Sequence, residues 1–547
     1  MPTHEVTNQP PPLVGYDASD DPALHAALDA FRPANREHSE AANARLNEIG
    51  RLAGSDRTQE QGRLANEYPP QLRTFDRYGH RLDEVEFHPA WHELMTTAVG
   101  HGLHATPWQD GRPGAHLDRA ARFYVWGQAE AGHLCPVSMT YAIVPALRHA
   151  PELAREFEPR LAATTYDPGR QPPEAKRGLT AGMSMTEKQG GSDVRANTTT
   201  AVKAGDGTYQ ITGHKWFTSA PMGDLFMVLA QVSDRGPTCF LLPKILPDGT
   251  RNAMHLQRLK DKLGNRSNAS AEVEYEGATA WLVGEEGRGV AAIIDMVNAT
   301  RLDCVLAAAT GLRLGVLHAA HHANYREAFG KKLRDQPLMA NVLADLAIES
   351  EAATTVAMRL AAAADSAASG DDYEKAFRRL ALAATKYHVC KLAAAHAAEA
   401  LECLGGNGYV EESQLPRLYR EAPLQSIWEG SGNVAALDAL RALTRQPEAA
   451  EAFFAELDQA RGADARLDDA IERLKKDAAD PSEPAARRLA ESLAVTLQAS
   501  LLIRHGHPAV ADAFTVTRLS GEGGRAYGTL PPGVNLTDIL PRAIPKI

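Results

Sequence analysis

The sequence predicts a mainly α-helical protein with one inserted β-domain. In two long regions apolar residues recur at intervals of three, four or seven, which is the spacing of helices that bury one face. Between these regions residues 272–276 alternate polar and apolar with period two, and Asp206-Gly207 is a hairpin-turn signal. A chain of 547 residues is too long for one hydrophobic core, so we expect several domains.

Taken in order, the chain divides into five predicted parts. These are a polar, proline-marked arm (1–35), an N-terminal helical domain (36–182), a β-domain (183–287), a helical bundle (288–445) and a C-terminal helical domain (446–547). The first helical domain carries Leu117, Ala120 and Tyr124 on one face. The bundle carries a longer stripe at helical spacing: Met339, Val342, Leu346, Ala353, Val356 and Leu360. The β-domain is expected to be antiparallel.

Charge and cysteine content limit the possible environments. Lys and Arg number 58 against 69 Asp and Glu, a net charge of −11, so the chain has no overall basic field for nucleic acid. The five cysteines show no C-x-x-C spacing, which favours a reducing compartment without a disulfide framework. We find no apolar span of about 18 residues and no signal peptide, and therefore expect a cytoplasmic protein with no membrane segment.

Two segments of the β-domain carry candidate ligand groups. In residues 183–194 the pair Gly190-Gly191 lets a ligand approach the backbone closely, and Thr186 and Ser192 offer hydroxyls to a polar heterocycle or phosphate. A polar turn is the alternative interpretation. At a predicted strand end, Trp216 stands two residues before a threonine, a pattern that suits a stacked flat ring, although an ordinary core aromatic explains it equally simply.

Three further segments lie in the helical bundle. Arg326, in REAFG, is a candidate for a pyrophosphate through bidentate bonding, or else a surface ion-pair residue. The glycines of LGGNGY (404–409) suit a ligand loop or a helix C-cap. Glu429, in SIWEGSGN (426–433), is a candidate general base, since an apolar pocket raises a carboxyl pKa; the alternative is an acid favoured by a helix N-terminus.

The order and spacing of these segments resemble the acyl-CoA dehydrogenase superfamily, and most closely its AidB-like branch. The resemblance rests on MTEKQGGSD (185–193), GHKWF (213–217), RLKDKLGNRSNAS (258–270), LPRLYRE (415–421) and SIWEGSGN (426–433). It is strong over residues 180–445 and implies the acyl-CoA dehydrogenase-like fold: an N-terminal helical domain, a central antiparallel β-domain and a C-terminal four-helix bundle, here with an extra C-terminal helical unit.

The resemblance also implies FAD as the cofactor and assigns residues to the site. Glu429 corresponds to the catalytic base, and no carboxylate is available at Thr300, before Arg301, where some family members place theirs. Ser192, Arg301 and Gly430 correspond to substrate-binding positions. Those implied to bind FAD are Met183, Met185, Thr186, Gly191, Ser192, Trp216, Phe217, Thr218, Arg326, Phe329, Gln336, Gly405, Gly406, Ser431 and Asn433. Glu402 departs from the usual glutamine near the adenine site.

The implied activity is α,β-dehydrogenation of a short or branched acyl-CoA by a homotetramer, with an electron-transferring flavoprotein as the acceptor. One alternative is an AidB-type flavoprotein that binds duplex DNA in alkylation-stress protection and keeps only vestigial dehydrogenase activity. Residues 441–547 carry 14 basic and 15 acidic residues, which is no electrostatic footprint for DNA. Oxidase or monooxygenase chemistry on the same scaffold is a third possibility. His318, His321 and His322 have metal-ligand spacing, but we interpret them as polar helix-face histidines and expect no metal.

Overall fold

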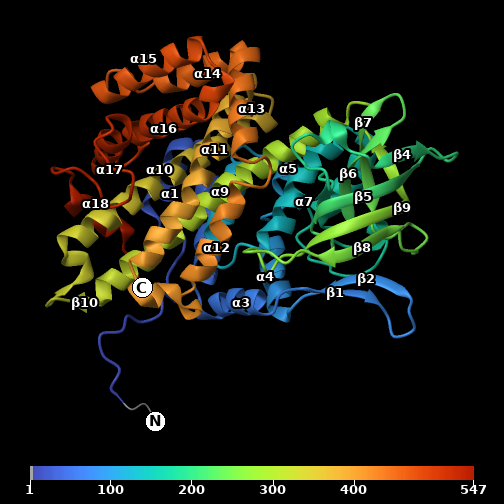
Figure 1. The fold of residues 1–547 in the computed structure, drawn as a ribbon, viewed down its shortest axis with the longest axis horizontal. Coiled ribbons are helices and arrows are strands. Elements are labelled where there is room, and N and C mark those ends of the chain that lie inside the picture. The colour runs from blue at the N-terminus through green and yellow to red at the C-terminus, as the bar shows by residue number, and fades with distance from the viewer. Residues whose placement is uncertain (1–3, 547) are drawn as a thin grey trace. The chain divides into compact units, whose positions relative to one another are not determined.

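The computed structural model describes residues 4–546 and separates them into two compact units (Figure 1). The first, called the helical unit, draws on Met1–Asp56, Pro113–Ala129 and Cys304–Ile547. The second, called the sheet unit, draws on Arg57–Arg112 and Glu130–Asp303. This division differs from the five parts expected along the chain, whose boundaries stay a prediction.

Helices of very different length build the helical unit. They are α1 (Pro22–Phe31), α2 (Arg36–Ala53), α6 (Ala115–Trp126), most of α9 (Gly289–Tyr325), α10 (Pro337–Ala368), α11 (Asp372–Glu402), α12 (Leu415–Gln425), α13 (Gly432–Arg445), α14 (Pro447–Asp458), α15 (Ala465–Ala479), α16 (Ala486–His505), α17 (Pro508–Phe514) and α18 (Leu536–Ala543). Short elements join them: the hairpin β10 (Glu327–Ala328) and β11 (Lys331–Lys332), η3 (Leu333–Asp335), η4 (Gly405–Tyr409), η5 (Glu411–Ser413), η6 (Glu483–Ala485) and η7 (Thr515–Leu519).

The predicted apolar stripe lies on α10, at the centre of this unit. Pro337 occupies the first turn, where its missing N–H costs no helical hydrogen bond. Ala353, Val356 and Leu360 are buried, and α10 packs on α1, α6, α11 and α16. The helical period read from the sequence therefore describes a helix surrounded by other helices.

The segment predicted as an extended arm contains a helix, α1, over part of its length. Asp21 caps α1 by accepting hydrogen bonds from the N–H groups of Ala23 and Leu24 at 2.9 and 3.4 Å. Leu24 and Leu28 are buried on the face that packs against α10. The polar and proline-rich flanks hid this short amphipathic pattern, which is stable because it docks.

The sheet unit contains a seven-stranded sheet, a separate two-stranded hairpin and short helices. Its strands are β1 (Gln71–Phe75), β2 (Arg81–Glu86), β3 (Ala181–Ser184), β4 (Thr200–Lys203), β5 (Tyr209–Ser219), β6 (Leu225–Val232), β7 (Gly236–Pro243), β8 (Met254–Leu259) and β9 (Ser270–Val283). Its helices are α3 (Asp56–Glu67), α4 (Pro89–Gly100), α5 (Pro107–Asp110), α7 (Leu134–Leu147), α8 (Pro151–Leu161), η1 (Pro173–Ala175) and η2 (Val194–Ala196), with the first part of α9.

Five strands of this sheet close into a ring in the order β5-β4-β6-β7-β9-β5. Phe226, Val228, Phe240 and Leu242 fill the core of this closed sheet and are wholly buried. Most ladders are antiparallel, as predicted, but β3 runs parallel to β6 over four residue pairs. Closure leaves few strand edges unpaired, which explains how a small β-domain stays stable.

A two-stranded hairpin, β1–β2, lies in the stretch predicted to be helical (36–182) and packs by β8 (Figure 1). Asp83 is wholly buried and accepts hydrogen bonds from Arg81 Nε at 2.8 Å and Arg251 Nη2 at 2.7 Å. These two arginines link the hairpin to the rest of the sheet unit. The two strands hold seven polar or charged residues against four apolar ones, so the alternating apolar signal of a half-buried strand is weak here.

In the part of the chain that the structure describes, we find no helix with the length and apolar character needed to cross a bilayer.

Replacing Leu24 by alanine is expected to release α1, because truncating a buried leucine costs about 2–5 kcal/mol. Hydrogen exchange of the α1 amides should accelerate at least about tenfold. His25→Ala, on the exposed side of the same helix, is the control and should leave exchange unchanged. Equal exchange in both variants would mean that α1 is not held by this contact.

Candidate functional site

The predicted site residues are divided between the two units, and each group is described within its own unit. The sheet unit holds Met183, Met185, Thr186, Gly191, Ser192, Trp216, Phe217, Thr218 and Arg301. The helical unit holds Arg326, Phe329, Gln336, Gly405, Gly406, Glu429, Gly430, Ser431 and Asn433.

In the sheet unit the loop of residues 185–199 joins β3 to β4. Gly190 has φ 134°, which a residue with a side chain rarely adopts, and a Cβ on Gly191 would lie 2.4 Å from the Thr186 hydroxyl oxygen. Both glycines are therefore required by the path of the loop. Among the described residues, no hydrogen bond engages the hydroxyl of Thr186 or Ser192. The loop thus presents polar groups that the protein itself does not use.

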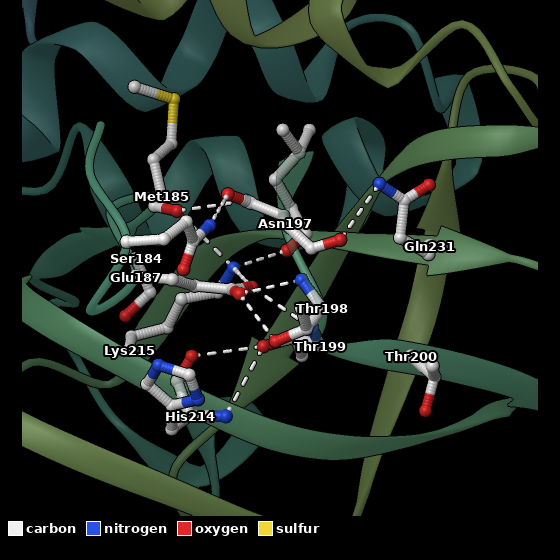
Figure 2. Close-up of polar contacts among 12 residues, drawn as sticks. Ser184, Met185, Glu187, Asn197, Thr198, Thr199, Thr200, His214, Lys215 and Gln231 are labelled. Atoms are coloured by element: carbon white, nitrogen blue, oxygen red, sulfur yellow. Dashed lines mark hydrogen bonds and ion pairs between the residues drawn. The ribbon is translucent and has the colours of Figure 1, made fainter. Parts of the chain in front are cut away.

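A buried ion pair lies under this loop (Figure 2). Lys215 Nζ lies 2.9 Å from Glu187 Oε1, and both side chains are wholly excluded from solvent. Lys215 also donates to the carbonyls of Leu229 at 2.6 Å and Met185 at 3.3 Å. The ammonium thereby connects the loop to strands β5 and β6.

Glu187 in turn holds the far end of the loop. It accepts hydrogen bonds from the N–H groups of Thr198 at 2.6 Å and Thr199 at 3.1 Å, and from the Thr198 hydroxyl at 2.9 Å. Burial alone would raise the pKa of Glu187, but the Thr198 N–H and the Lys215 charge outweigh it and lower the pKa to about 2. Burial lowers the pKa of Lys215 to about 8, against the opposing effect of Glu187, so both groups are charged at neutral pH.

Amide and hydroxyl groups complete the network in Figure 2. Asn197 Nδ2 donates to the Met185 carbonyl at 3.1 Å, and Gln231 Nε2 donates to the Asn197 carbonyl at 3.1 Å. The Thr199 hydroxyl donates to the His214 carbonyl at 2.9 Å. Both ends of the loop are therefore fixed, at Met185 and at residues 197–199.

Sequence reasoning did not single out Glu187, Lys215, Asn197 or Gln231. The signal for Lys215 was present, because it shares the inward register of β5 with Tyr209 and Ile211. A lysine at a core position implies a buried carboxylate partner.

A bulge in β5 determines how its predicted aromatic segment is displayed. The pairing with β9 shifts by one residue between Lys215 and Thr218. Trp216 is half-buried, with Lys260 Nζ 3.3 Å from its ring centroid, and Phe217 is exposed. The Thr218 hydroxyl is buried and bonded to the Ser184 hydroxyl at 2.5 Å. The two rings thus face outward while Thr218 faces into the sheet.

In the helical unit the predicted Arg326 motif forms the hairpin β10–β11. Arg326 Nη1 donates to the Asn8 carbonyl at 2.6 Å, and Gln336 Nε2 donates to the Ala328 carbonyl at 2.9 Å. Phe329 stands at the turn with φ 54° and is 98% exposed. Gly405 and Gly406 belong to η4 and have open space around them.

Glu429 lies in the connection between α12 and α13. Its backbone has φ 56°, an unfavourable value for a residue with a side chain, and its side chain is half-buried. Because α13 begins at Gly432, Glu429 precedes the first helical turn, and the alternative interpretation as a helix N-terminal acid loses support.

The residues that follow Glu429 are also positioned. Gly430 has φ 101°, and its carbonyl accepts a hydrogen bond from Lys386 Nζ. Ser431 caps α13 without using its hydroxyl, and Asn433 Oδ1 accepts from Arg487 Nε at 2.8 Å.

Of the three α9 histidines interpreted as polar helix-face groups, His318 is partly buried and the other two are more fully enclosed. His321 and His322 are buried, and His321 Nε2 lies 2.8 Å from the Pro11 carbonyl. Burial lowers the pKa of His322 to about 4.

Comparisons with known proteins cover nearly the whole chain. The AidB adaptive response protein N-terminal domain matches residues 8–168, the acyl-CoA dehydrogenase middle domain matches 182–278, and the acyl-CoA dehydrogenase C-terminal domain matches 287–444. The Escherichia coli (strain K12) protein AidB, whose name assigns it to the acyl-CoA dehydrogenases, is 43% identical over 525 residues, 95% of each chain.

Solved structures agree with the predicted fold class, which is confirmed. Caenorhabditis elegans ACDH-11 in complex with C11-CoA superimposes with TM-score 0.85 at 28% identity and covers 94% of this chain and 92% of its own. An acyl-CoA dehydrogenase from Bacillus anthracis complexed with FAD has TM-score 0.66 at 18% identity, covering 90% of this chain and 84% of its own, which shows a shared fold.

Glu187→Gln is expected to lower the free energy of unfolding of the sheet unit by about 3–5 kcal/mol, because it leaves the buried Lys215 ammonium without its counter-charge. The native pKa of Glu187 lies below its unfolded value, so this contribution is complete above about pH 4.5 and lost toward pH 2. Urea titrations at several pH values measure it. Glu274→Gln, at an exposed position of β9, is the control, and an equal loss in both variants would contradict the role of the pair.

Proposed function

This chain belongs to the AidB-like branch of the acyl-CoA dehydrogenase family, which makes it an FAD-dependent oxidoreductase of that kind, and we propose that Glu429 is its catalytic base and a short or branched acyl-CoA its substrate. The observation that carries the base assignment is the strained backbone of Glu429, φ 56°, immediately before the glycine that leads into α13. Strain of this kind persists where surrounding structure enforces a particular side-chain direction.

The residues present fit the flavin. In the glycine loop of the sheet unit, Gly191 lies so near Thr186 that a Cβ on it would clash with the Thr186 hydroxyl. Within the described residues, the Thr186 and Ser192 hydroxyls make no hydrogen bond. In the helical unit, Arg326 and Gln336 offer charged and polar groups beyond the bonds they already make. We assign the polar edge of the ring to Thr186, the flat face to Trp216 and a phosphate group to Arg326.

Bound FAD supplies a two-electron acceptor for the hydrogen that leaves the β-carbon of the substrate. The chain must supply the rest. The Glu429 carboxylate removes a proton from the α-carbon, and its own backbone N–H hydrogen-bonds the thioester carbonyl oxygen, where negative charge develops. The Glu429 side chain is half-buried, so it is only partly exposed to water.

The acyl-CoA substrate is supported by the relative ACDH-11, which was solved with C11-CoA. The family resemblance supports an electron-transferring flavoprotein as the electron acceptor. A reducing, cytoplasmic location is supported by the five cysteines, which are all buried and form no disulfide in the described chain.

We also propose that the protein is a homotetramer. Phe329 supports this, because a phenylalanine that is 98% exposed at the tip of a hairpin leaves a large apolar surface in water. Burial in a neighbouring copy would contribute about 1.5–3 kcal/mol for each side chain. The adjacent Arg326 and Gln336 would then serve the flavin of that neighbour.

Duplex DNA binding is the weaker candidate. Several basic side chains of the C-terminal part pair with acids of the same unit: Arg461 with Asp458 and Glu472, Arg466 with Asp464 and Asp512, Lys475 with Asp458, and Arg504 with Glu456. No observation of the structure favours it over the enzyme.

Glu429→Gln should lower the rate of anaerobic flavin reduction by an acyl-CoA about 10²–10⁴-fold, since an amide cannot accept the α-proton. Stopped-flow absorbance with butanoyl-, isovaleryl- and undecanoyl-CoA measures the rate, and the ratio of FAD to protein should stay at the wild-type value. Glu412→Gln, an exposed position in the same unit, is the control. Reduction of the Glu429→Gln flavin at the wild-type rate would exclude Glu429 as the base.

Phe329→Ser should give a species smaller than the wild-type oligomer and a lower ratio of FAD to protein, because it removes the apolar contact of the hairpin tip. Sedimentation velocity and the flavin absorbance report the two effects. Tyr78→Ser, in the turn of the β1–β2 hairpin where the side chain is 69% exposed, should change neither. An unchanged oligomer in Phe329→Ser would refute this use of the hairpin.

A further inference from the structure

A cavity of about 320 Å³ lies within the sheet unit and shares no residue with the candidate site. Its border is formed by β2, α4, the segment 166–171, and the residues just before β6 and just after β7. The elements β2, α4, β6 and β7 are labelled in Figure 1. A volume of this size is within the range of small-molecule sites, at its lower end.

Neutral aromatic groups form one wall. Phe87 and Trp91 stack with ring centroids 3.8 Å apart, and His92 Nδ1 lies 3.0 Å from the Tyr166 hydroxyl. Burial lowers the pKa of His92 and raises that of Tyr166, so neither is charged at neutral pH. Met95, Pro136, Met222 and Ile245 add apolar surface. This wall suits the face or edge of a flat ring.

The indole of Trp91 carries a donor that the protein does not satisfy. Its side chain is 1% exposed, and Nε1 has no acceptor within the described residues. Burying a donor without a partner is costly, and such groups in native structures are usually matched by something that the protein binds. The cavity therefore calls for a ligand with a hydrogen-bond acceptor.

Three carboxylates around the cavity form close ion pairs with cations other than Lys244, although the charge of Asp224 also acts on Lys244. Glu84 pairs with Arg170 at 2.6 Å, Asp224 with Lys176 at 2.6 Å, and Glu86 with Arg73 at 2.8 Å.

In the described chain Lys244 has no carboxylate within 4.0 Å, and Nζ donates to the Pro221 carbonyl at 2.9 Å. Burial lowers the pKa of Lys244 to about 8, so the group is still mainly protonated at neutral pH. Its remaining N–H groups are available to an anion.

We propose that this cavity binds an aromatic monocarboxylate of one or two rings, with its ring against the aromatic wall and its carboxylate on Lys244 and Trp91 Nε1. The flat, neutral wall selects the ring. The spare ammonium and the unsatisfied indole N–H select the carboxylate, which accepts from both donors. This site is separate from the proposed dehydrogenation and does not depend on it.

Isothermal titration of the FAD-loaded protein with 1-naphthoate tests the proposal, in the presence of saturating undecanoyl-CoA so that the acyl site is occupied. We expect one binding event per chain. 1-Naphthylmethanol, which lacks the charge, and cyclohexanecarboxylate, which lacks the flat ring, should each bind at least about tenfold more weakly. Absence of binding at millimolar naphthoate, or equal binding of all three compounds, would overturn the proposal.

Variants locate the site. Lys244→Met should weaken naphthoate binding at least about tenfold, and Trp91→Phe, which keeps the ring and removes the N–H, about threefold or more. Lys203→Met, on the exposed side of β4, is the matched control and should bind as the wild type does. Undiminished naphthoate binding in both cavity variants would place the ligand elsewhere and end the proposal. If a variant fails to fold, the comparison of the three compounds on the wild-type protein still tests which ligand chemistry the cavity selects.

Discussion

The wholly buried ion pair between Glu187 and Lys215 is the constraint on which the sheet-unit part of the site depends. Removing two charges from water is expensive, and their attraction compensates only when the remaining donors and acceptors are also used. Both conditions are met here. Glu187 accepts hydrogen bonds from the N–H groups of Thr198 and Thr199, and Lys215 donates to the carbonyls of Met185 and Leu229. A glycine-containing loop has no core of its own, so this network supplies the rigidity that a flavin contact requires.

Backbone strain is also found at two of the proposed functional positions of the helical unit. Phe329 and Glu429 have φ values of 54° and 56°, which side chains adopt only when neighbouring structure compels them. A two-residue-strand hairpin holds the first, and the start of α13 follows closely after the second. In both cases a regular element lies beside the strained residue and stabilises its unfavourable backbone conformation. A helical bundle alone would present side chains only along its helix faces, whereas these strained connections direct groups away from them.

The sequence predicted those features that repeat or that use distinctive residues. The stripe through Val356 and Leu360 defines α10, whereas the ligand loops that the resemblance assigns to the glycines, Trp216 and Glu429 stay a prediction. It did not predict α1, whose ten-residue pattern lies among prolines and polar residues, nor the β1–β2 hairpin, whose strands hold more polar and charged residues than apolar ones. Nor did it predict the pairing of Glu187 with Lys215, because residues 28 positions apart meet only through the strand register. Long-range pairing of this kind follows from topology, which local patterns do not encode.

The same logic of paired charges separates structural cations from available ones. Buried or largely buried cations of the described chain generally lie against carboxylates: Arg313 with Asp21, Arg359 with Glu374 and Glu456, Arg518 with Asp345 and Glu349, and Lys176 with Asp224. Acidic residues are in excess in this chain, so a cation left without one reflects the arrangement of the fold and not a shortage of partners. Within the described residues Lys244 has no carboxylate within 4.0 Å, and it lines the same cavity as Trp91, whose N–H is also unsatisfied. A single ligand carboxylate would supply both the acceptor that the indole lacks and the counter-charge that the ammonium lacks.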